Sequence, residues 1–386
     1  MKAISFNGRD NSGKSQQVRF LKWKNEEFFH VTKPLSAYST RWPNLHGCEA
    51  SRWWFEEVGM RELTDIIIES LIARQEDFLD GKISIYDRGV KMFKAVCAAT
   101  RMTRENILLS EAISITNRQF ASASKYLIEE YEVFLEADPV YFREVEDFVE
   151  IVRPREDAGF PENIRQQYQK YQSNLSATTG VYFGNIGFHI RVGEPILLIQ
   201  NQIRERINFL YKIKLPLIKP VTQLIVGFGG LSESGKSSFA EYLRTSHNFC
   251  RLKLRYFIES LEKRSQEVTP EAVCFELLDY LERHYFLTRI SIESLHDPFI
   301  PSMLKLMLGS RMQIVYIEVE HSIRVRRTAL ELGITFKEVE DIVSKKDKIK
   351  RDRGAERVKG IADIVFNNSS DSHESSLATF SNLLFL

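Results

Sequence analysis

Two short apolar runs each stop at a glycine-containing loop and continue as a helical pattern. The first covers residues 2–7 (KAISFN) and leads through its loop into SQQVRFLKWKNEE. The second covers residues 223–229 (QLIVGFG) and leads into SSFAEYLRTS. A buried strand that runs into a tight loop and then a helix is typical of the opening of a βαβ unit. The pattern therefore predicts two such openings in one chain.

Further apolar runs alternate with amphipathic stretches in both halves. They predict strands at residues 27–31, 83–86, 131–137, 289–293, 313–319 and 363–366. We expect a long helix over RELTDIIIESLIARQEDFLDG that ends near Gly81, a helix over ILLIQNQIRERINFL, and a C-terminal helix after Asp371. Strands that alternate with helices indicate a parallel, doubly wound sheet, so the predicted fold class is α/β.

The length of 386 residues favours two domains. The stretch YKIKLPLIKPV at 211–221 contains two prolines and three lysines and lies just before the second opening. We therefore predict one domain over residues 1–212, a linker over 213–221 and a second domain over 222–386.

Composition narrows the function classes. The formal net charge of +1 argues against bulk binding of nucleic acid, and the 43% hydrophobic and 27% charged residues are typical of a globular protein. The four cysteines lie far apart without zinc-ligand spacing, which fits a reducing compartment. No apolar run approaches the ~20 residues of a membrane span, and the first residues do not resemble a signal peptide. We expect a cytoplasmic protein that binds neither nucleic acid nor a membrane.

Both loops match the pattern GxxxxGK[ST] of a P-loop, or Walker A motif. The first reads Gly8, Arg9, Asp10, Asn11, Ser12, Gly13, Lys14, Ser15, and the second reads Gly230, Leu231, Ser232, Glu233, Ser234, Gly235, Lys236, Ser237. Such a loop wraps a polyphosphate with its backbone N–H groups, and the following helix points its N-terminus at the same anion. Lys14 and Lys236 are expected to reach the β- and γ-phosphates as catalytic residues, and the Ser15 and Ser237 hydroxyls to bind Mg²⁺. The predicted cofactors are ATP and Mg²⁺.

The first half resembles the thymidylate kinase family. The resemblance rests on FNGRDNSGKSQQ, on LDGKISIYDRG, on FLEADP at residues 134–139 and on RPREDAGFPENIRQQYQKY at residues 153–171. It implies that Asp87 helps to hold Mg²⁺ or the acceptor, that Arg88 contacts phosphate, and that Arg153 and Arg155 close over the transferring group. Phosphoryl transfer asks a protein mainly for positioning and charge neutralisation. Arg153 and Arg155 could instead belong to a solvated charged face.

Two positions depart from that family. Its acceptor-binding arginine after the second strand corresponds to Lys33, and an ungapped count from Asp87 places its phosphate-binding helix arginine at Ile67. Residues 38–57 carry Trp42, Trp53 and Trp54 beside arginines, which would suit a ring-bearing anionic acceptor. The same tryptophans could equally belong to a core or an interface. The kinase chemistry is therefore expected to carry over better than the thymidylate specificity.

The second half resembles dephospho-coenzyme A kinase and related small P-loop kinases. The resemblance rests on GFGGLSESGKSSFAEYL, on IVYIEVEHSIRVRRTA and on KKDKIKRDRGAERVKGIADIVFNNSS. It implies that Arg324 and its neighbours Arg326 and Arg327 neutralise phosphate, and that Asn367 and Asn368 lie near the base of the nucleotide. Glu293, His296 and Asp297 follow a predicted strand, where a base or an Mg²⁺ ligand could stand.

These observations predict two P-loop NTPase domains of the nucleotide-kinase type, each a mostly parallel sheet between helices. The expected function is an ATP-dependent kinase acting on a nucleotide, nucleoside or similar small molecule. A regulatory P-loop ATPase or nucleotide sensor that acts through a protein partner is the alternative, and a scaffold with two inactive sites is a third. The expected partners are a nucleotide donor and a small acceptor. Oligomeric state, including a homodimer, stays open.

Overall fold

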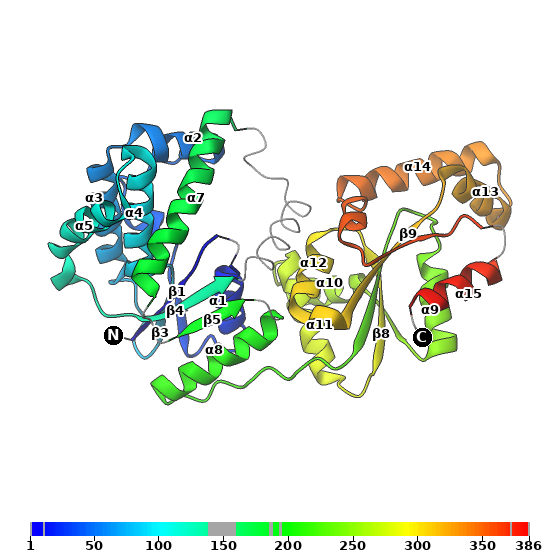
Figure 1. The fold of residues 1–386 in the computed structure, drawn as a ribbon. Helices are drawn as coiled ribbons and strands as arrows, with labels where there is room; N and C mark the ends of the chain where they lie inside the picture. The colour runs from blue at the N-terminus through cyan, green and yellow to red at the C-terminus, as the bar shows by residue number, and fades with distance from the viewer. Residues whose placement is uncertain are drawn as a thin grey trace. The chain divides into compact units, whose positions relative to one another are not determined.

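We analysed a computed structural model that describes residues 2–10, 12–137, 160–184, 188–192, 195–370 and 373–384. The described residues gather into two compact units (Figure 1). The second unit comprises Pro195–Leu197 and the residues from Ile218 onward, and the first comprises the other described residues up to Leu217. Each unit is described by itself below. No described helix combines the length and the apolar character that crossing a membrane requires.

The first unit is built on a five-stranded sheet in which every strand pair is parallel, in the order β2-β3-β1-β4-β5. All five residues of β1 are buried, as expected for a central strand of a sheet that is covered on both faces. The strands are β1 (Ala3–Asn7), β2 (Phe29–Val31), β3 (Ile83–Asp87), β4 (Tyr131–Ala137) and β5 (His189–Val192).

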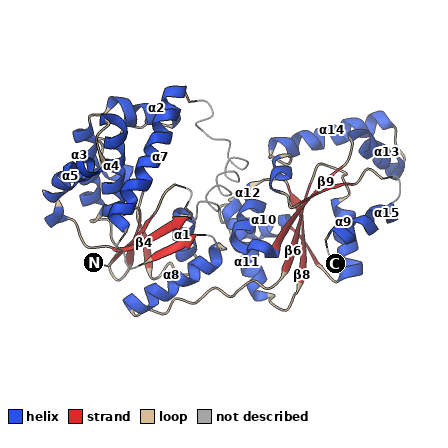
Figure 2. Cartoon of the chain, in the orientation of Figure 1, coloured by secondary structure: helices blue, strands red, loops and turns tan. Residues whose placement is uncertain are grey.

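Helices cover both faces of this sheet (Figure 2). One hydrophobic cluster joins the strands to α1 and α8, and another joins Phe134 of β4 to α4 and α7, which pack against each other. The described helices of the unit are α1 (Lys14–Lys22), α2 (Gly47–Arg52), α3 (Met60–Arg74), α4 (Val90–Glu105), α5 (Leu109–Ala121), α7 (Glu162–Phe183) and α8 (Ile196–Tyr211), with short turns η1 (Leu35–Tyr38), η2 (Trp53–Glu57) and η3 (Ser124–Tyr126).

The second unit repeats the arrangement with a five-stranded parallel sheet in the order β10-β9-β6-β8-β7. Its elements are β6 (Leu224–Gly229), α9 (Lys236–His247), β7 (Cys250–Lys253), α10 (Leu254–Lys263), α11 (Pro270–Arg283), β8 (Arg289–Leu295), α12 (Phe299–Leu308), η5 (Gly309–Arg311), β9 (Met312–Glu318), α13 (His321–Leu332), α14 (Phe336–Asp352), η6 (Arg357–Ile361), β10 (Ile364–Asn367) and α15 (His373–Leu383). A cluster of phenylalanines and aliphatic residues packs α9 and α15 on one face of this sheet.

The two sheets have the same topology. When each set of strands is numbered from the strand before its glycine loop, the second sheet read from its other edge has the order of the first. The predicted α/β class with parallel sheets is therefore confirmed. One predicted boundary is wrong: the helix expected to end near Gly81 ends at Arg74. The chain turns there through backbone bonds such as that from the Asp77 N–H to the Arg74 carbonyl oxygen at 3.1 Å, and the Asp77 carboxylate then bonds to His30 Nε2 at 2.8 Å and to the hydroxyl of Tyr38.

Candidate functional site

The first phosphate loop connects β1 to α1 at the carboxyl edge of the sheet, where parallel α/β proteins bind ligands. Gly8 has φ 142°, and a Cβ at this position would lie 2.5 Å from the carbonyl oxygen of Leu135, so a side chain has no room. Gly13 has φ 80° and directly precedes α1. The free N–H groups of the α1 N-terminus thus face the space next to the loop, which favours an anion there.

Lys14 lies at the start of α1 and is buried under the loop. Its Nζ donates to the carbonyl oxygen of Arg9 at 2.5 Å and lies 3.5 Å from the Ser12 hydroxyl, itself 1% exposed. Burial, followed by the nearby Arg88 guanidinium, lowers the pKa of Lys14 to about 8. Burial and Arg88 thus disfavour the charged form of Lys14, and the negative charge of a bound polyphosphate would stabilise that form.

Ser15 and Asp87 form a candidate metal site. The Ser15 hydroxyl donates to the Asp87 carboxylate at 3.0 Å, and Asp87 ends β3 beside Phe6 of β1. Asp87 is exposed, so its carboxylate can keep water around it. A hydroxyl and a carboxylate are oxygen ligands of the kind that Mg²⁺ uses together with waters and substrate phosphates. The described residues contain no group of three or more His, Cys, Asp or Glu that could hold a metal unaided.

Arg88 follows Asp87 in a left-handed conformation with φ 70°. Its Nη2 donates to Asp10 of the loop at 2.6 Å. The other carboxylate oxygen of Asp10 accepts from Gln172 at 3.0 Å and from the Tyr168 hydroxyl at 3.3 Å, both on α7. Although burial acts in the opposite direction, the charges of Arg88 and Lys14 and the hydrogen bond from Gln172 hold the pKa of Asp10 below its usual range. The loop, the end of β3 and α7 are therefore joined by one polar network.

Arg74, at the end of α3, supports this network from the interior. It is 1% exposed, donates to the Arg88 carbonyl oxygen at 2.8 Å and stacks on the ring of Tyr86 at 4.0 Å. Its second partner is Glu130, which is also buried and lies 3.5 Å away. The guanidinium is thus used inside the unit and is not turned toward a ligand.

A cavity of about 550 Å³ opens beside Ser15 and Asp87. The size is within the usual range of small-molecule sites. The described residues that line it are Ser15, Val18, Arg19, Val31, Thr32, Lys33, Pro34, Leu35, Ser36, Trp42, Trp54, Asp87, Arg88, Phe93, Val96, Tyr171 and Leu175. We take it as the candidate acceptor cavity.

The positions that depart from the thymidylate kinase pattern lie in different places. Lys33 lines the acceptor cavity, whereas Ile67 is fully buried in the hydrophobic core and faces no ligand. Trp42 and Trp54 line the cavity with their ring planes 17° apart, while Trp53 packs beside them without lining it. All three tryptophans pack against the hydrophobic core, and Trp42 and Trp54 also line the cavity.

The second phosphate loop connects β6 to α9 with the same geometry. Gly230 has φ 132°, and a Cβ there would lie 2.4 Å from the carbonyl oxygen of Ile317. Lys236 donates to the carbonyl oxygen of Leu231 and to the Ser234 hydroxyl at 3.0 Å. Burial, followed by nearby Lys350, lowers the pKa of Lys236 to about 7.

Ser237 and Glu293 correspond to the pair in the first unit. The Ser237 hydroxyl donates to Glu293 at 2.7 Å, and Glu293 lies in β8, the strand next to β6. Glu293 differs from Asp87 in being 2% exposed and in forming an ion pair with Arg251 of β7. Arg251 also pairs with Glu241 of α9 at 2.9 Å. The sequence offered Glu293 as a possible ligand, but the arginine that neutralises it was missed.

Several side chains from the end of the second unit hold its loop in place. Arg324 is 2% exposed and donates to the Ser232 carbonyl oxygen at 2.8 Å and to Asp347 at 2.7 Å. Asp347 in turn accepts from the Ser232 N–H at 2.9 Å. Gly235, with φ 95°, completes the turn, and Lys346 pairs with Glu233 at 3.0 Å. Arg324 therefore contacts the loop backbone, and a phosphate-neutralising role stays a prediction.

Asn368, which follows β10, donates to the Ser234 carbonyl oxygen at 3.1 Å. His296, just after β8, has a pKa lowered to about 3 by burial and by Lys350, Lys236 and Arg353. A base this weak is poorly matched to taking a proton at neutral pH. These cations gather where the second loop would hold a polyanion, and sequence periodicity alone gave no sign of Lys350 or Arg353. Asn11, Arg153 and Arg155 lie outside the described residues, so their predicted roles stay predictions.

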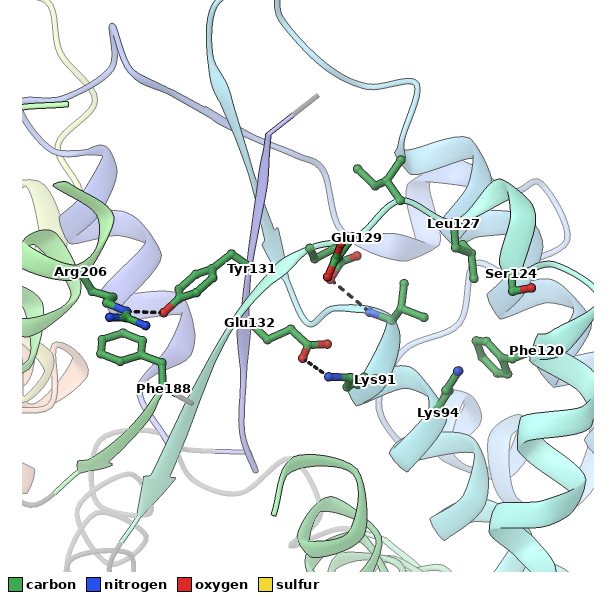
Figure 3. A pocket seen from close by; sticks show the side chains of 13 residues that line it. Lys91, Lys94, Phe120, Ser124, Leu127, Glu129, Tyr131, Glu132, Phe188 and Arg206 are labelled. Atoms are coloured by element: carbon green, nitrogen blue, oxygen red, sulfur yellow. Dashed lines mark hydrogen bonds and ion pairs between the residues drawn. The ribbon is translucent and has the colours of Figure 1, made fainter. Parts of the chain in front are cut away.

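A second cavity of about 550 Å³ in the first unit lies at the opposite end of β4 (Figure 3). Its charged residues are largely satisfied by neighbours: Lys91 pairs with Glu132 at 2.6 Å, and Arg206 donates to the Tyr131 hydroxyl at 2.8 Å. It contains no residue of the phosphate loop. The cavity beside Ser15 is therefore the better candidate for the acceptor.

Comparison with known proteins gave neither a matching family model nor a matching curated protein. Several solved structures are similar in fold. A thymidylate kinase from Candida albicans is 16% identical with a TM-score of 0.39 and covers 56% of this chain and 96% of its own. A shikimate kinase from Bacteroides thetaiotaomicron (18%, TM-score 0.26) covers 42% of this chain and 99% of its own. A gluconokinase from Sinorhizobium meliloti (13%, TM-score 0.27) covers 43% and 98%.

All three neighbours are P-loop kinases. At these identities and scores the likeness describes the fold and carries no argument about substrates. The tandem arrangement and the resemblance of the second half to dephospho-coenzyme A kinase stay predictions.

Proposed function

We propose that the chain is a Mg²⁺- and ATP-dependent phosphotransferase with two nucleotide sites, of which the first unit transfers the γ-phosphoryl group to a small molecule in the acceptor cavity. The observation that carries the proposal is the serine–carboxylate pair beside a buried loop lysine, formed by Ser15 with Asp87 and by Ser237 with Glu293. P-loop kinases place Mg²⁺ and the phosphates of the donor at such a pair. In the first unit a cavity of substrate size lies next to this pair.

In the proposed reaction, an oxygen of the acceptor forms a bond to the γ-phosphorus while the bond from that phosphorus to the bridging oxygen breaks, and ADP leaves with the electron pair. Bound Mg²⁺ would neutralise charge on the β- and γ-phosphates. Lys14 would stabilise the negative charge that develops on the bridging oxygen. Arg88 would hold the anionic group of the acceptor in line with the γ-phosphorus. An acceptor that reacts through an ionised phosphate or carboxylate needs no proton acceptor. Arg153 and Arg155 are proposed to close over the transferring group.

The second unit supports a different candidate role, that of a nucleotide sensor. Its carboxylate Glu293 is buried and already paired with Arg251, and its loop is bonded to Asp347 and Asn368. Binding of Mg²⁺ and nucleotide there would have to displace the ion pair with Arg251. A site whose occupation rearranges an ion pair is better suited to reporting nucleotide binding than to fast turnover.

Turnover of γ-labelled ATP by the full chain tests the proposal. We expect transfer of label to an acceptor in a small-molecule panel or, more slowly, to water, with loss of activity when Mg²⁺ is chelated. Lys14→Ala should abolish transfer, whereas Lys236→Ala should leave a large part of it and remove one of two bound nucleotides. Lys24→Ala, an exposed lysine near the end of α1, is the matched control. Unchanged ATP consumption by Lys14→Ala would refute a catalytic role of the first loop.

A further inference from the structure

We propose that the acceptor cavity of the first unit takes a small anion with an apolar, ring-bearing body, and that it disfavours a nucleobase. The identification of this ligand as the phosphoryl acceptor rests on the proposed function. Its chemical class rests on the wall of the cavity and can be tested by binding alone.

The charge of the wall calls for an anion. Its described residues include three cations, Arg19, Lys33 and Arg88, and a single carboxylate, Asp87. Arg88 is paired with Asp10 of the phosphate loop, and Asp87 is engaged by the Ser15 hydroxyl. The Lys33 ammonium group has no hydrogen bond or ion pair with the described residues, while its backbone N–H is fixed by the Tyr38 hydroxyl at 2.9 Å. A lysine whose backbone is anchored and whose charge is unpaired suits an anionic ligand.

The remainder of the wall is largely apolar. Trp42 and Trp54 present nearly parallel rings with centroids 6.2 Å apart. The other apolar side chains that line the cavity are Val18, Val31, Pro34, Leu35, Phe93, Val96 and Leu175. A flat or apolar body gains contact with such a surface, and aromatic walls favour rings.

The hydrogen-bonding groups of the wall are mostly used within the protein. The indole N–H of Trp42 donates to Ser70 at 2.8 Å, and that of Trp54 donates to Thr100 at 3.1 Å. The Thr32 hydroxyl donates to the carbonyl oxygen of Ile85 at 3.2 Å. The tryptophans therefore offer rings without donors.

Two neutral hydroxyls of the described wall are left for a ligand, those of Ser36 and Tyr171. A nucleobase brings several donors and acceptors along its edge, and groups left unpaired against apolar walls oppose binding. A site that recognises polar edges needs matching partners. Apart from the cations that would hold the anionic group, the described side chains offer a nucleobase few such partners, so a ring with an apolar edge fits better.

Equilibrium binding to the full chain, measured by tryptophan fluorescence and by calorimetry, tests this inference. The probes are phenyl phosphate, benzoate, thymidine monophosphate and inorganic phosphate. We expect phenyl phosphate or benzoate to bind at least about tenfold more tightly than thymidine monophosphate and inorganic phosphate. The two aryl probes distinguish a phosphate head from a carboxylate head.

Variants locate the site. Lys33→Met should weaken binding of the preferred aryl anion about tenfold, whereas Lys24→Met should not. Trp54→Ala should weaken it more than Trp53→Ala, which removes a neighbouring ring that does not line the cavity. Trp54→Phe, which keeps a ring without the indole N–H, should retain binding and guards against loss of fold.

Thymidine monophosphate binding as tightly as the aryl anions would overturn the inference, as would the absence of aryl-anion binding at millimolar concentration or equal effects of Lys33→Met and Lys24→Met. Failure of the proposed function appears separately. If the chain binds the aryl anion but consumes no ATP, the inferred ligand class stands and the proposed kinase activity is refuted. If the chain phosphorylates thymidine monophosphate in preference to the aryl anions, the kinase activity stands and the inferred ligand class is refuted.

Discussion

Replacing Arg74 with methionine should separate the stability of the first unit from its chemistry. Arg74 donates to the carbonyl oxygen of Arg88 and pairs with Glu130, and both members of this pair are almost fully buried. Arg88 has a left-handed backbone and reaches Asp10 of the phosphate loop. Methionine keeps much of the volume and removes the charge and the donors.

The expected loss of stability follows from the carboxylate left behind. Removing one partner of a buried ion pair typically costs about 3–5 kcal/mol, because the other charge stays buried without compensation. In a unit of this size that corresponds to a fall in melting temperature of roughly 6–20 °C. Adding Glu130→Gln removes the leftover charge and should recover a large part of the loss.

Turnover should not recover in the double variant, because the Arg88 carbonyl oxygen still lacks its donor. A displacement of about 1 Å in a positioned group can cost on the order of a hundredfold in rate. We therefore expect Arg74→Met to lower ATP turnover tenfold or more while the dissociation constant of ATP changes little. Arg101→Met is the matched control, since Arg101 is also buried and its hydrogen bonds go to Glu105 and Gln119, which do not belong to the candidate site.

A double-mutant cycle with Arg88→Met decides whether Arg74 acts through Arg88. If it does, Arg74→Met adds nothing to the turnover defect of Arg88→Met. Independent, multiplying defects in the two variants would refute the reasoning, as would full recovery of turnover in the variant that combines Arg74→Met with Glu130→Gln.

Three further results are expected. Asp87→Asn should lower turnover at least a hundredfold and change ATP affinity only a few-fold, measured by labelled-ATP assay and calorimetry; turnover near wild type would remove Asp87 from the mechanism. A bound polyphosphate raises the pKa of a loop lysine, so ATP affinity is greatest below the pKa of the free site and falls by up to about tenfold per pH unit above it. With pKa values of about 7 for Lys236 and about 8 for Lys14, the second site should weaken first as pH rises, and calorimetry on the variants that retain one loop lysine would show the reverse order if this is wrong. Arg251→Met should lower the Mg²⁺ concentration needed for nucleotide binding at the second site, because it frees Glu293; an unchanged Mg²⁺ requirement contradicts the proposed competition.

Local sequence patterns predicted the parts of the fold that depend on local chemistry. Both strand–loop–helix openings were recognised because an apolar run, two glycines and a helical pattern are contiguous, and the structure has β1 and β6 where they were expected. The helix predicted before β3 is too long, because no glycine or proline interrupts its polar end before Gly81. The helix ends at Arg74, and just beyond it Asp77 pairs with His30, a residue 47 positions away that no local pattern could indicate.

In the candidate site, too, some residues could be predicted from local patterns, whereas others depend on contacts between distant parts of the chain. Asp87 could be named because it ends a strand next to the loop strand, which topology places at the ligand edge. The support of Arg88 by Arg74, and of the second loop by Asp347, could not be named. The second of these joins residues 115 positions apart, and no periodicity encodes such pairings. Charged residues on a helix look solvated in sequence, whereas Arg74, Arg324 and Asp347 are buried.

The difference between the two units lies in what surrounds an equivalent carboxylate. Asp87 is exposed, is bonded to Ser15 and borders a cavity, so an arriving Mg²⁺ need replace only water and the hydrogen bond between Ser15 and Asp87. Glu293 is almost fully buried beside Arg251, so the same ion must compete with a fixed guanidinium in a poorly solvated place. Because a buried ion pair is costly to separate, occupation of the second site should be coupled to movement of β7 and α9, which carry Arg251 and its second partner Glu241. That coupling requires no turnover, which is why we infer catalysis in the first unit and nucleotide sensing in the second.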